Sequence, residues 1–298
     1  MAATLGSAWR EAALRLECAG VETPALDARL LLEAAAGVSR LELLADPERP
    51  LSETSEGAFL GLVERRARRE PVSRILGRKA FWTLELGLRP GVLTPRPETE
   101  TLVEAALAAM PRQEPAGLLD LGVGSGAILL ALLAERPLAF GVGVDLADDA
   151  LAVASDNAGR CRLSARAAFV RSDWATAIAD RSFDIAVANP PYVASGDIDE
   201  LAPEARDFEP LLAIDGGADG LCAYRALAGD LVRVLRPGGS FFLEVGAGQS
   251  RAVAEVMAMA GAVQLESVRD LGGLERVVSG KSPPDNGPVL DKPAQVAT

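Results

Sequence analysis

Apolar segments of strand length alternate with helix-like segments through the later part of the chain, and no other feature restricts its fold as strongly. The strand-like segments are LLDLG (118–122), AFGVGVD (139–145), AAFVRSD (167–173), FDIAVANPPY (183–192) and SFFLEVG (240–246). The intervening helix-like segments include AILLALLAERP (127–137), DDALAVASDNAGR (148–160) and LCAYRALAGDLVRVLRPGG (221–239). This alternation predicts an α/β fold with a doubly wound, mostly parallel sheet.

The N-terminal part has a different pattern, with apolar residues at helical spacing only. Thr23 followed by Pro24 predicts a helix start, and Ser52 or Ser55 is a candidate N-cap of a later helix. A small all-helical domain is therefore expected to precede the sheet.

A proline-rich segment lies between the two patterns. Within it, AFWTLEL (80–86) alternates like a strand, and Thr99 is a candidate N-cap for the helix ETLVEAALAAM (100–110). The end of the chain is rich in proline and polar residues, which is typical of disorder. The expected division is a helical domain over 1–75, a hairpin and linker over 76–98, an α/β domain over 99–280 and a disordered tail over 281–298.

Composition excludes several classes of function. The net charge is −12, whereas a general nucleic-acid binder is expected to carry a basic surface. The basic cluster ERRARRE (64–70) has helical spacing and acidic flanks, which favours a solvated helix face over a partner-binding patch. The chain has no histidine, so any catalysis proceeds without the commonest general base and metal ligand. We expect no metal site.

The three cysteines are far apart, which argues against a disulfide framework and fits a reduced compartment. Charged residues interrupt the apolar residues at the N-terminus, so no secretory signal is expected, and no segment has the composition of a membrane span. We therefore expect a cytoplasmic protein without membrane association.

A glycine-rich loop follows the first strand of the α/β part. In DLGVGSGA (120–127) the predicted cofactor-binding residues are Gly122, Val123, Gly124, Ser125 and Gly126. Glycines allow a sharp turn and close approach of a ligand to the backbone, and the next helix offers free N–H groups. The loop alone is ambiguous, because it also fits a dinucleotide-binding pattern and an ordinary structural turn.

Acidic and aromatic residues follow the next two strands. Asp145 ends the second strand, where an acid in a doubly wound fold accepts hydrogen bonds from ribose hydroxyls. Asp173 and Trp174 follow the third strand and suit hydrogen bonding and stacking on adenine. Alternatively, Asp145 is a helix-capping carboxylate and Trp174 is a packed side chain. Together with the glycine loop, these residues indicate a cofactor that contains adenosine.

The fourth strand ends in Asn189, Pro190, Pro191 and Tyr192, at the edge of the sheet where such folds bind ligands. An amide or aryl-amine nitrogen is a poor nucleophile because its lone pair is delocalised, and it carries two hydrogens. The side-chain oxygen of Asn189 and the carbonyl of Pro190 are two rigid acceptors for them, which orient the nitrogen and stabilise the positive charge that develops on it. Tyr192 is expected to line the planar group, although simple packing also explains it. We predict Asn189, Pro190 and Tyr192 as catalytic and all four residues as substrate-binding.

The combined motifs resemble those of class I S-adenosylmethionine-dependent methyltransferases that act on planar nitrogen, and more closely the HemK-type release factor glutamine methyltransferases. The motifs that carry the closer resemblance are RREPVSRILGRKAFW (68–82), GVLTPRPETE (91–100), DLGVGSGA (120–127), GVDLADDALAVASDNA (143–158), FDIAVANPPY (183–192), FEPLLAIDGGADGL (208–221), LRPGGSFFLEVGAGQ (235–249) and LERVVSG (274–280). The segment PRPETE favours the release-factor branch over the glutamine methyltransferases of ribosomal proteins, in which Ser-Pro is typical after Pro-Arg.

The resemblance implies a Rossmann-like methyltransferase domain and a helical N-terminal domain that docks the substrate. It implies S-adenosyl-L-methionine as cofactor, S-adenosyl-L-homocysteine as product and peptide-chain release factors as partners. The methylated group is the glutamine of their Gly-Gly-Gln motif. Asn189 is implied in cofactor binding as well as in catalysis. The chain departs from the family pattern at Val123, Thr94, Arg74 and Glu275, none of which is a catalytic group.

Four alternatives remain open from the sequence. The Asn-Pro-Pro-Tyr motif also suits an adenine amino methyltransferase that acts on nucleic acid, and a ribosomal-protein glutamine methyltransferase is a further alternative. An NAD-dependent oxidoreductase explains the glycine loop and Asp145 but not Asn189–Tyr192. A non-catalytic cofactor-binding module is disfavoured by the intact motif. No sequence feature fixes the oligomeric state, and we expect a monomer.

Overall fold

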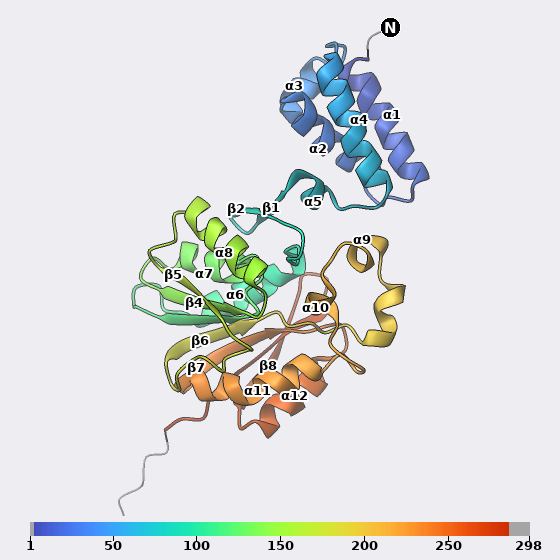
Figure 1. The fold of residues 1–298 in the computed structure, drawn as a ribbon. Helices are drawn as coiled ribbons and strands as arrows, with labels where there is room; N and C mark the ends of the chain where they lie inside the picture. The colour runs from blue at the N-terminus through green and yellow to red at the C-terminus, as the bar shows by residue number, and fades with distance from the viewer. Residues whose placement is uncertain (1–2, 286–298) are drawn as a thin grey trace, which may run out of the picture.

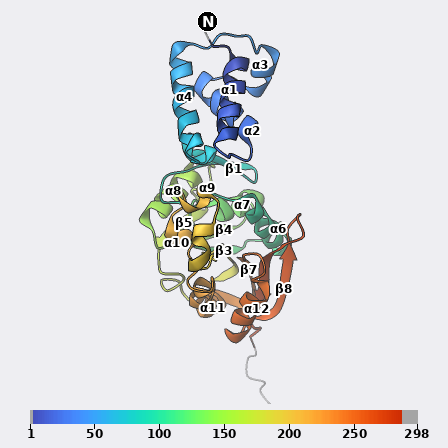
Figure 2. The same ribbon diagram turned by 90° about the vertical axis from the view of Figure 1, so that its right-hand side faces the viewer.

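The computed structural model describes residues 3–285, in which a helical part and a sheet-containing part are joined by a narrow neck (Figures 1 and 2). The helical part consists of α1 (Leu5–Cys18), α2 (Pro24–Ala36), α3 (Arg40–Ala45), α4 (Glu53–Ala67) and α5 (Val72–Leu76). Its apolar side chains, among them Leu16, Leu31 and Phe59, form a core of their own. A separate core is what lets these helices stand apart from the sheet.

The larger part is built on one seven-stranded sheet. Its strands are β3 (Gly117–Leu121), β4 (Phe140–Asp145), β5 (Ala167–Arg171), β6 (Phe183–Ala188), β7 (Leu235–Glu244), β8 (Val263–Arg269) and β9 (Glu275–Lys281). They lie in the order β5-β4-β3-β6-β7-β9-β8. The first five are parallel, and β9 is antiparallel to both of its neighbours. The predicted α/β fold with a doubly wound, mostly parallel sheet is confirmed.

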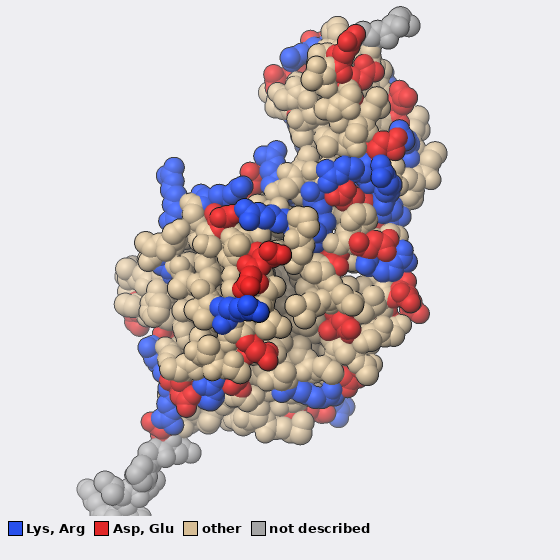
Figure 3. Space-filling model, viewed as in Figure 1, with Lys and Arg blue, Asp and Glu red and all other residues tan. Residues whose placement is uncertain are grey.

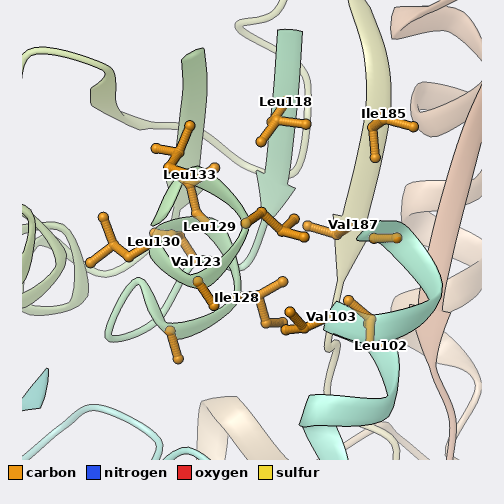
Figure 4. Close-up of a cluster of buried hydrophobic side chains, with 14 of the residues drawn as sticks. Leu102, Val103, Leu118, Val123, Ile128, Leu129, Leu130, Leu133, Ile185 and Val187 are labelled. Carbon is orange, nitrogen blue, oxygen red and sulfur yellow. The ribbon is translucent and has the colours of Figure 1, made fainter. Parts of the chain in front are cut away.

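Helices cover both faces of this sheet. They are α6 (Glu100–Ala109), α7 (Ala127–Glu135) and α8 (Asp148–Arg160) on one face, and α11 (Cys222–Val234) and α12 (Ser250–Met259) on the other. Successive strand residues point to opposite faces, so Leu118 packs on the first side and Leu119 on the second. Figure 4 shows Leu118 and Ile185 on neighbouring strands, in the same cluster as Leu129, Leu130 and Leu133 of α7.

Short elements complete the chain around the edge where the parallel strands end. They are the hairpin strands β1 (Arg78–Phe81) and β2 (Leu84–Gly87), the 3₁₀ helices η1 (Pro97–Thr99) and η2 (Ser195–Glu200), and the short helices α9 (Pro203–Arg206) and α10 (Leu211–Ile214). The single strand expected over 80–86 is wrong, because Trp82 has a φ of 54° and turns the chain into the β1–β2 hairpin.

Three further expectations about element ends are corrected. The helix expected to reach Gly239 ends at Val234, and the five residues after it belong to β7. Thr99 ends η1 and makes no capping hydrogen bond, whereas Ser52 caps α4 by accepting from the Ser55 N–H. Thr23 precedes α2 as expected, but its hydroxyl donates to the Asp27 side chain instead of capping.

The disordered tail expected over 281–298 is wrong at its start. Lys281 ends β9, and Ser282 is buried, with its N–H donating to the Gly239 carbonyl and its hydroxyl to the Arg236 carbonyl. The rest of that prediction, over 286–298, lies outside the described residues. Across the part of the chain that is described, no helix has both the length and the apolar composition needed to cross a bilayer.

The basic cluster 64–70 was expected to be a solvated helix face, and this is wrong for its central residues. Arg66 is only 5% exposed and binds Asp27 at 2.7 Å and Glu204 at 3.0 Å. Arg69 also binds Glu204, at 2.7 Å. Figure 3 shows Lys and Arg side chains gathered at the neck. Since Glu204 belongs to α9 of the larger part, these ion pairs tie the two parts together.

Candidate active site

A cavity of about 370 Å³ lies at the carboxyl ends of β4, β5 and β6. The glycine loop, residues 91–99 and α10 complete its wall. Its volume falls within the range of about 300–1,000 Å³ that is usual for small-molecule sites. Its place at the carboxyl ends of parallel strands is where such sheets bind ligands. It therefore contains the predicted glycine loop, Asp145, Asp173, Trp174 and Asn189 in one site.

The glycine loop is held against β4 by backbone hydrogen bonds. The N–H groups of Gly122 and Val123 both donate to the Val144 carbonyl, each at 2.9 Å. Gly126 has a φ of 83°, and a Cβ there would lie 3.1 Å from the Leu130 side chain. The loop is therefore a close turn that only glycine can make without strain, and it places its backbone along the cavity wall.

Val123 and Ser125, both predicted cofactor-binding residues, also have structural contacts. Val123 is buried, and its side chain fills the space above Gly143, where an added Cβ would lie 2.6 Å from Val123 Cγ2. Ser125 is buried as well, and its carbonyl accepts a hydrogen bond from Asn157 Nδ2 at 2.9 Å. An apolar residue at position 123 is therefore compatible with the loop.

The Asp145 carboxylate joins the loop to the start of the next helix. Its Oδ2 accepts from the Gly124 N–H at 2.9 Å, and its Oδ1 accepts from the Ala147 N–H at 3.0 Å. A carboxylate oxygen has a second lone pair, so each can accept one further hydrogen bond from a ligand. Asp145 is thus suited both to shaping the loop and to holding ribose hydroxyls.

Trp174 and Asp173 also line the cavity. A Cβ built on Gly122 would be 3.9 Å from Cζ3 of Trp174, so the indole lies close to the glycine loop. Trp174 has a φ of 46°, a conformation that is uncommon for a bulky residue. Asp173 is exposed at the cavity. The pair has an aromatic face and an acceptor available to a planar base.

Asn189, Pro190 and Pro191 line the cavity directly after β6. Asn189 Nδ2 donates to the Thr99 hydroxyl at 3.3 Å, so the amide is held through its NH₂ group. The side-chain oxygen of Asn189, Oδ1, is then left to accept hydrogen bonds in the cavity. This orientation suits the predicted role of Asn189 as an acceptor.

Tyr192 is not among the residues that line this cavity. Its ring packs beside Gly246 and against the core formed with α11 and β7, and its carbonyl accepts from Gln249 Nε2 at 2.9 Å. Burial raises the pKa of its hydroxyl to about 12. The expected contact of Tyr192 with a substrate amide stays a prediction.

Gly220 supports the Asn189–Tyr192 segment from behind. It has a φ of 71°, and a Cβ there would lie 2.4 Å from the Tyr192 carbonyl oxygen and 2.5 Å from Gln249 Nε2. A Gly220→Ala substitution should therefore displace this segment. We expect it to lower the free energy of unfolding by about 2 kcal/mol or more and to reduce kcat, as measured by denaturant unfolding and initial rates.

Gly196→Ala is the matched control for Gly220→Ala, because position 196 has open space around it and no positive φ. It should leave both stability and kcat nearly unchanged. If the two alanine variants behaved alike, the supporting role of Gly220 would be wrong.

Asp120, at the end of β3 beneath the glycine loop, is a buried acid that the predicted site residues did not include. It is 1% exposed and accepts from the Leu129 N–H of α7 at 3.2 Å, while Oδ1 has no partner among the described residues. Burial, with a smaller contribution from the Asp145 charge, raises the pKa of this carboxyl to about 7. The folded protein therefore keeps a proton on Asp120 at pH values where the unfolded chain has lost it.

This proton predicts a pH-dependent effect of Asp120→Asn. Between about pH 4 and pH 7 the folded state binds more protons than the unfolded state, so wild-type stability falls as pH rises through that window. Asparagine does not titrate, so the variant should gain on the order of 2 kcal/mol relative to wild type between pH 5 and pH 8. Denaturant unfolding at both pH values measures this gain. The exposed Asp156→Asn variant should show none, and an equal gain there would contradict the assignment to Asp120.

A second buried acid, Glu209, connects the neck to the cavity. Its side chain is 1% exposed and binds Arg74 at 2.6 Å, Arg96 at 3.3 Å and the Thr94 N–H at 3.1 Å. Arg74 belongs to α5, and Arg96 lines the cavity. Arg74 and Thr94, two of the positions that depart from the family pattern, thus both bind the Glu209 carboxylate.

Glu275, the other departure outside the loop, accepts from the Ser250 hydroxyl and pairs with Arg269 at 3.0 Å. It therefore links β9 to the start of α12 and to β8.

Sequence reasoning missed three polar residues beside the Asn189–Tyr192 segment, namely Thr99, Glu244 and Gln249. Thr99 was interpreted only as a helix cap, although it lies 90 positions before its partner Asn189. Glu244 ends β7 beside the end of β6. A search for polar residues at the ends of neighbouring parallel strands would have found Glu244.

Two family models match the chain. The model described as "PrmC N-terminal domain" matches residues 7–77, and the one described as "Methyltransferase small domain" matches residues 99–205. The first covers the five helices of the N-terminal part, and the second covers the glycine loop and Asn189.

Several curated proteins are similar over nearly the whole chain, and each is named release factor glutamine methyltransferase. The protein of Caulobacter vibrioides is 51% identical over 97% of this chain and 100% of its own length. That of Rhodospirillum rubrum is 47% identical over 92% and 84%, and that of Agrobacterium fabrum is 42% identical over 93% and 97%.

Among solved structures, a methyltransferase from Pyrococcus furiosus superimposes with a TM-score of 0.51. It shares 16% identity over 74% of this chain and 98% of its own. At that identity the likeness concerns the fold, which is the methyltransferase sheet described above.

Proposed function

Because the chain belongs to the release factor glutamine methyltransferase family, we propose that it methylates the side-chain amide of the Gly-Gly-Gln glutamine in peptide-chain release factors. The methyl donor is S-adenosyl-L-methionine, and the product is S-adenosyl-L-homocysteine. The observation that carries the proposal is Asn189, whose NH₂ group is held by Thr99 and whose oxygen is left for a substrate amide.

The residues present fit this cofactor. The glycine loop supplies close backbone approach through Gly122 and Gly124, and Asp145 has lone pairs left for ribose hydroxyls. Asp173 and Trp174, which also line the cavity, suit the adenine ring. We also assign Val123, Ser125 and Gly126 to the cofactor side and propose that no metal takes part.

The substrate amide is held by Asn189 and the Pro190 carbonyl. Their two oxygens accept the two hydrogens of the glutamine nitrogen, which fixes the nitrogen in line with the methyl group. When bound, the cofactor supplies a methyl group on a positively charged sulfur, and the electrons of the broken carbon–sulfur bond return to that sulfur. The acceptors stabilise the positive charge that develops on nitrogen, which then loses a proton. Pro191 and Tyr192 complete the substrate side in this proposal.

The helical N-terminal domain is assigned to substrate docking. Glu209 binds both Arg74, at the base of this domain, and Arg96, at the cavity. A protein bound to the helices would therefore lie beside the cavity. We further propose that the enzyme acts in the cytoplasm, where release factors work, and that it acts as a monomer, because one chain supplies every residue assigned here.

A substrate panel tests the proposed target. The enzyme is incubated with labelled cofactor and, in separate reactions, a release factor, ribosomal proteins, RNA and DNA. We expect label on the release factor alone. Label on RNA, DNA or a ribosomal protein in preference to the release factor would favour one of the alternatives that the Asn-Pro-Pro-Tyr motif left open.

A further inference from the structure

The carboxyl group of Glu244 lies behind the candidate catalytic amide. Strands β6 and β7 are parallel neighbours with Ala188 opposite Leu243, so Asn189 and Glu244 are the next residues of the two strands. Glu244 is 2% exposed, and its Oε2 has no hydrogen-bond partner among the described residues. Burial of a carboxylate without full pairing costs free energy, so its position calls for an explanation.

Thr99 and Asn189 lie beside this carboxyl. Asn189 Nδ2 donates to Thr99 Oγ1 at 3.3 Å, and Thr99 is 2% exposed. Both residues also favour the charged form of Glu244 and keep its pKa lower than burial alone would. A carboxylate only accepts, so the Thr99 hydroxyl and the Asn189 NH₂ group are the donors that suit it. Because Thr99 engages the NH₂ edge of Asn189, the amide oxygen is left free.

We propose that Glu244 is a positioning residue that acts through Thr99 to hold the Asn189 amide with its oxygen toward the substrate nitrogen. This inference rests on the proposed function. The carboxylate also polarises the amide, since a hydrogen bond accepted from Nδ2 strengthens Oδ1 as an acceptor. Its negative charge favours the positive charge that develops on the substrate nitrogen.

The protonated form of Glu244 cannot position the Asn189 amide in this way. A protonated Glu244 has a hydroxyl donor of its own and can donate to the Thr99 oxygen, which removes the fixed direction of the hydrogen bonds. The Asn189 amide is then free to turn its NH₂ edge toward the substrate, where two hydrogens would oppose the hydrogens of the glutamine nitrogen. Activity should therefore follow the ionisation of Glu244.

The groups around Glu244 place this ionisation near neutral pH. Burial raises the pKa of the carboxyl to about 7, with Glu98 of η1 raising it further and Arg276 of β9 lowering it. Arg276 itself pairs with Asp270, so it is not a direct partner of Glu244.

Two tyrosines also face this group. Tyr224 donates its hydroxyl to the Glu244 backbone carbonyl at 2.7 Å, and burial raises its pKa. Burial likewise raises the pKa of Tyr192 to about 12, so both tyrosines keep their protons where Glu244 titrates. Because the carboxylate is the active form, kcat should rise with pH through about 7 and then level off.

The test compares wild type with Glu244→Gln at saturating cofactor between about pH 5.5 and about pH 9. Saturation matters because Asp120, beneath the glycine loop, also has its pKa raised to about 7 and would act through cofactor affinity. For Glu244→Gln we expect a kcat about ten- to a hundredfold lower on the plateau, an unchanged KM for the release factor and no rise near pH 7. Calorimetric cofactor binding confirms that the variant is folded.

Two further comparisons separate positioning from a structural role. Thr99→Val breaks the connection and should lower kcat, whereas Thr99→Ser keeps the hydroxyl and should recover most of it. Glu275→Gln, in the same sheet but bound to Ser250 and Arg269, should keep the wild-type pH profile. Wild-type kcat with the same pH dependence in Glu244→Gln would overturn the inference. A wild-type enzyme without activity on release factors would contradict the proposed function first, and the inference would fall with it.

Discussion

Asn189→Ala should lower kcat by about a hundredfold to a thousandfold while leaving cofactor affinity largely unchanged. The substitution removes the oxygen that accepts a hydrogen from the substrate nitrogen, and loss of one preorganised group at the reacting centre has effects of about this size. Alanine also ends the hydrogen bond to the Thr99 hydroxyl, so nothing of the original amide remains at the cavity.

Rapid mixing of the Asn189→Ala variant with excess release factor measures kcat, and calorimetry with S-adenosyl-L-homocysteine measures affinity for the cofactor product. The two measurements distinguish an effect on the chemical step from an effect on cofactor binding. A lower kcat with intact binding places the loss in the chemical step, whereas normal turnover would refute the acceptor role of Asn189.

Asp145→Ala should have the opposite signature, weakening the cofactor about a hundredfold with a much smaller change in kcat at saturation. Its carboxylate accepts from the Gly124 N–H at 2.9 Å and the Ala147 N–H at 3.0 Å, so alanine leaves two N–H groups without their charged acceptor and removes the ribose contact. Hydrogen bonds to charged groups contribute about 1.5–3 kcal/mol each, which corresponds to a loss of this order.

Asp148→Ala is the matched control for Asp145→Ala. Its side chain is 72% exposed and pairs only with the exposed Arg171, and such surface pairs contribute little. Calorimetry should show wild-type cofactor affinity for this variant. Unchanged affinity in Asp145→Ala as well would remove Asp145 from the cofactor site. Titration with NAD should give no binding to wild type, and tight NAD binding would revive the oxidoreductase alternative.

The parts of the site that the sequence predicted are those carried by short motifs at strand ends. Gly122 and Asn189 each follow a strand, and Asp145 ends one. The apolar pattern of these strands is visible by itself, and parallel strands bring such ends together. The order of the motifs along the chain was therefore enough to place these residues in one cavity.

The contacts between distant segments could not be predicted in the same way. Thr99 contacts Asn189, Arg66 contacts Glu204 and Arg74 contacts Glu209 only after the whole chain has folded. Arg66 illustrates the difficulty, because a run of arginines with acidic flanks has the same sequence signature on a solvated helix as in a buried ion pair. Nothing in the spacing says that Glu204 will lie beside it.

Local conformation accounts for the remaining errors. Trp82 takes a φ of 54° and divides an apparent strand into a hairpin, although its sequence neighbours favour extended structure. The helix that was expected to reach Gly239 ends at Val234, and Pro237 lies within β7. In both cases pairing with a neighbouring strand overrides the local preference.

The most direct test of the proposed function locates the methyl group on the product. Wild-type enzyme, release factor and S-adenosyl-L-methionine are incubated, and the release factor is digested and sequenced by tandem mass spectrometry. We expect one methyl group on the side-chain amide nitrogen of the glutamine in the Gly-Gly-Gln peptide, and none when that glutamine is replaced. A methyl group on any other residue of the release factor, or an unmodified Gly-Gly-Gln peptide from an enzyme that binds its cofactor, would contradict it.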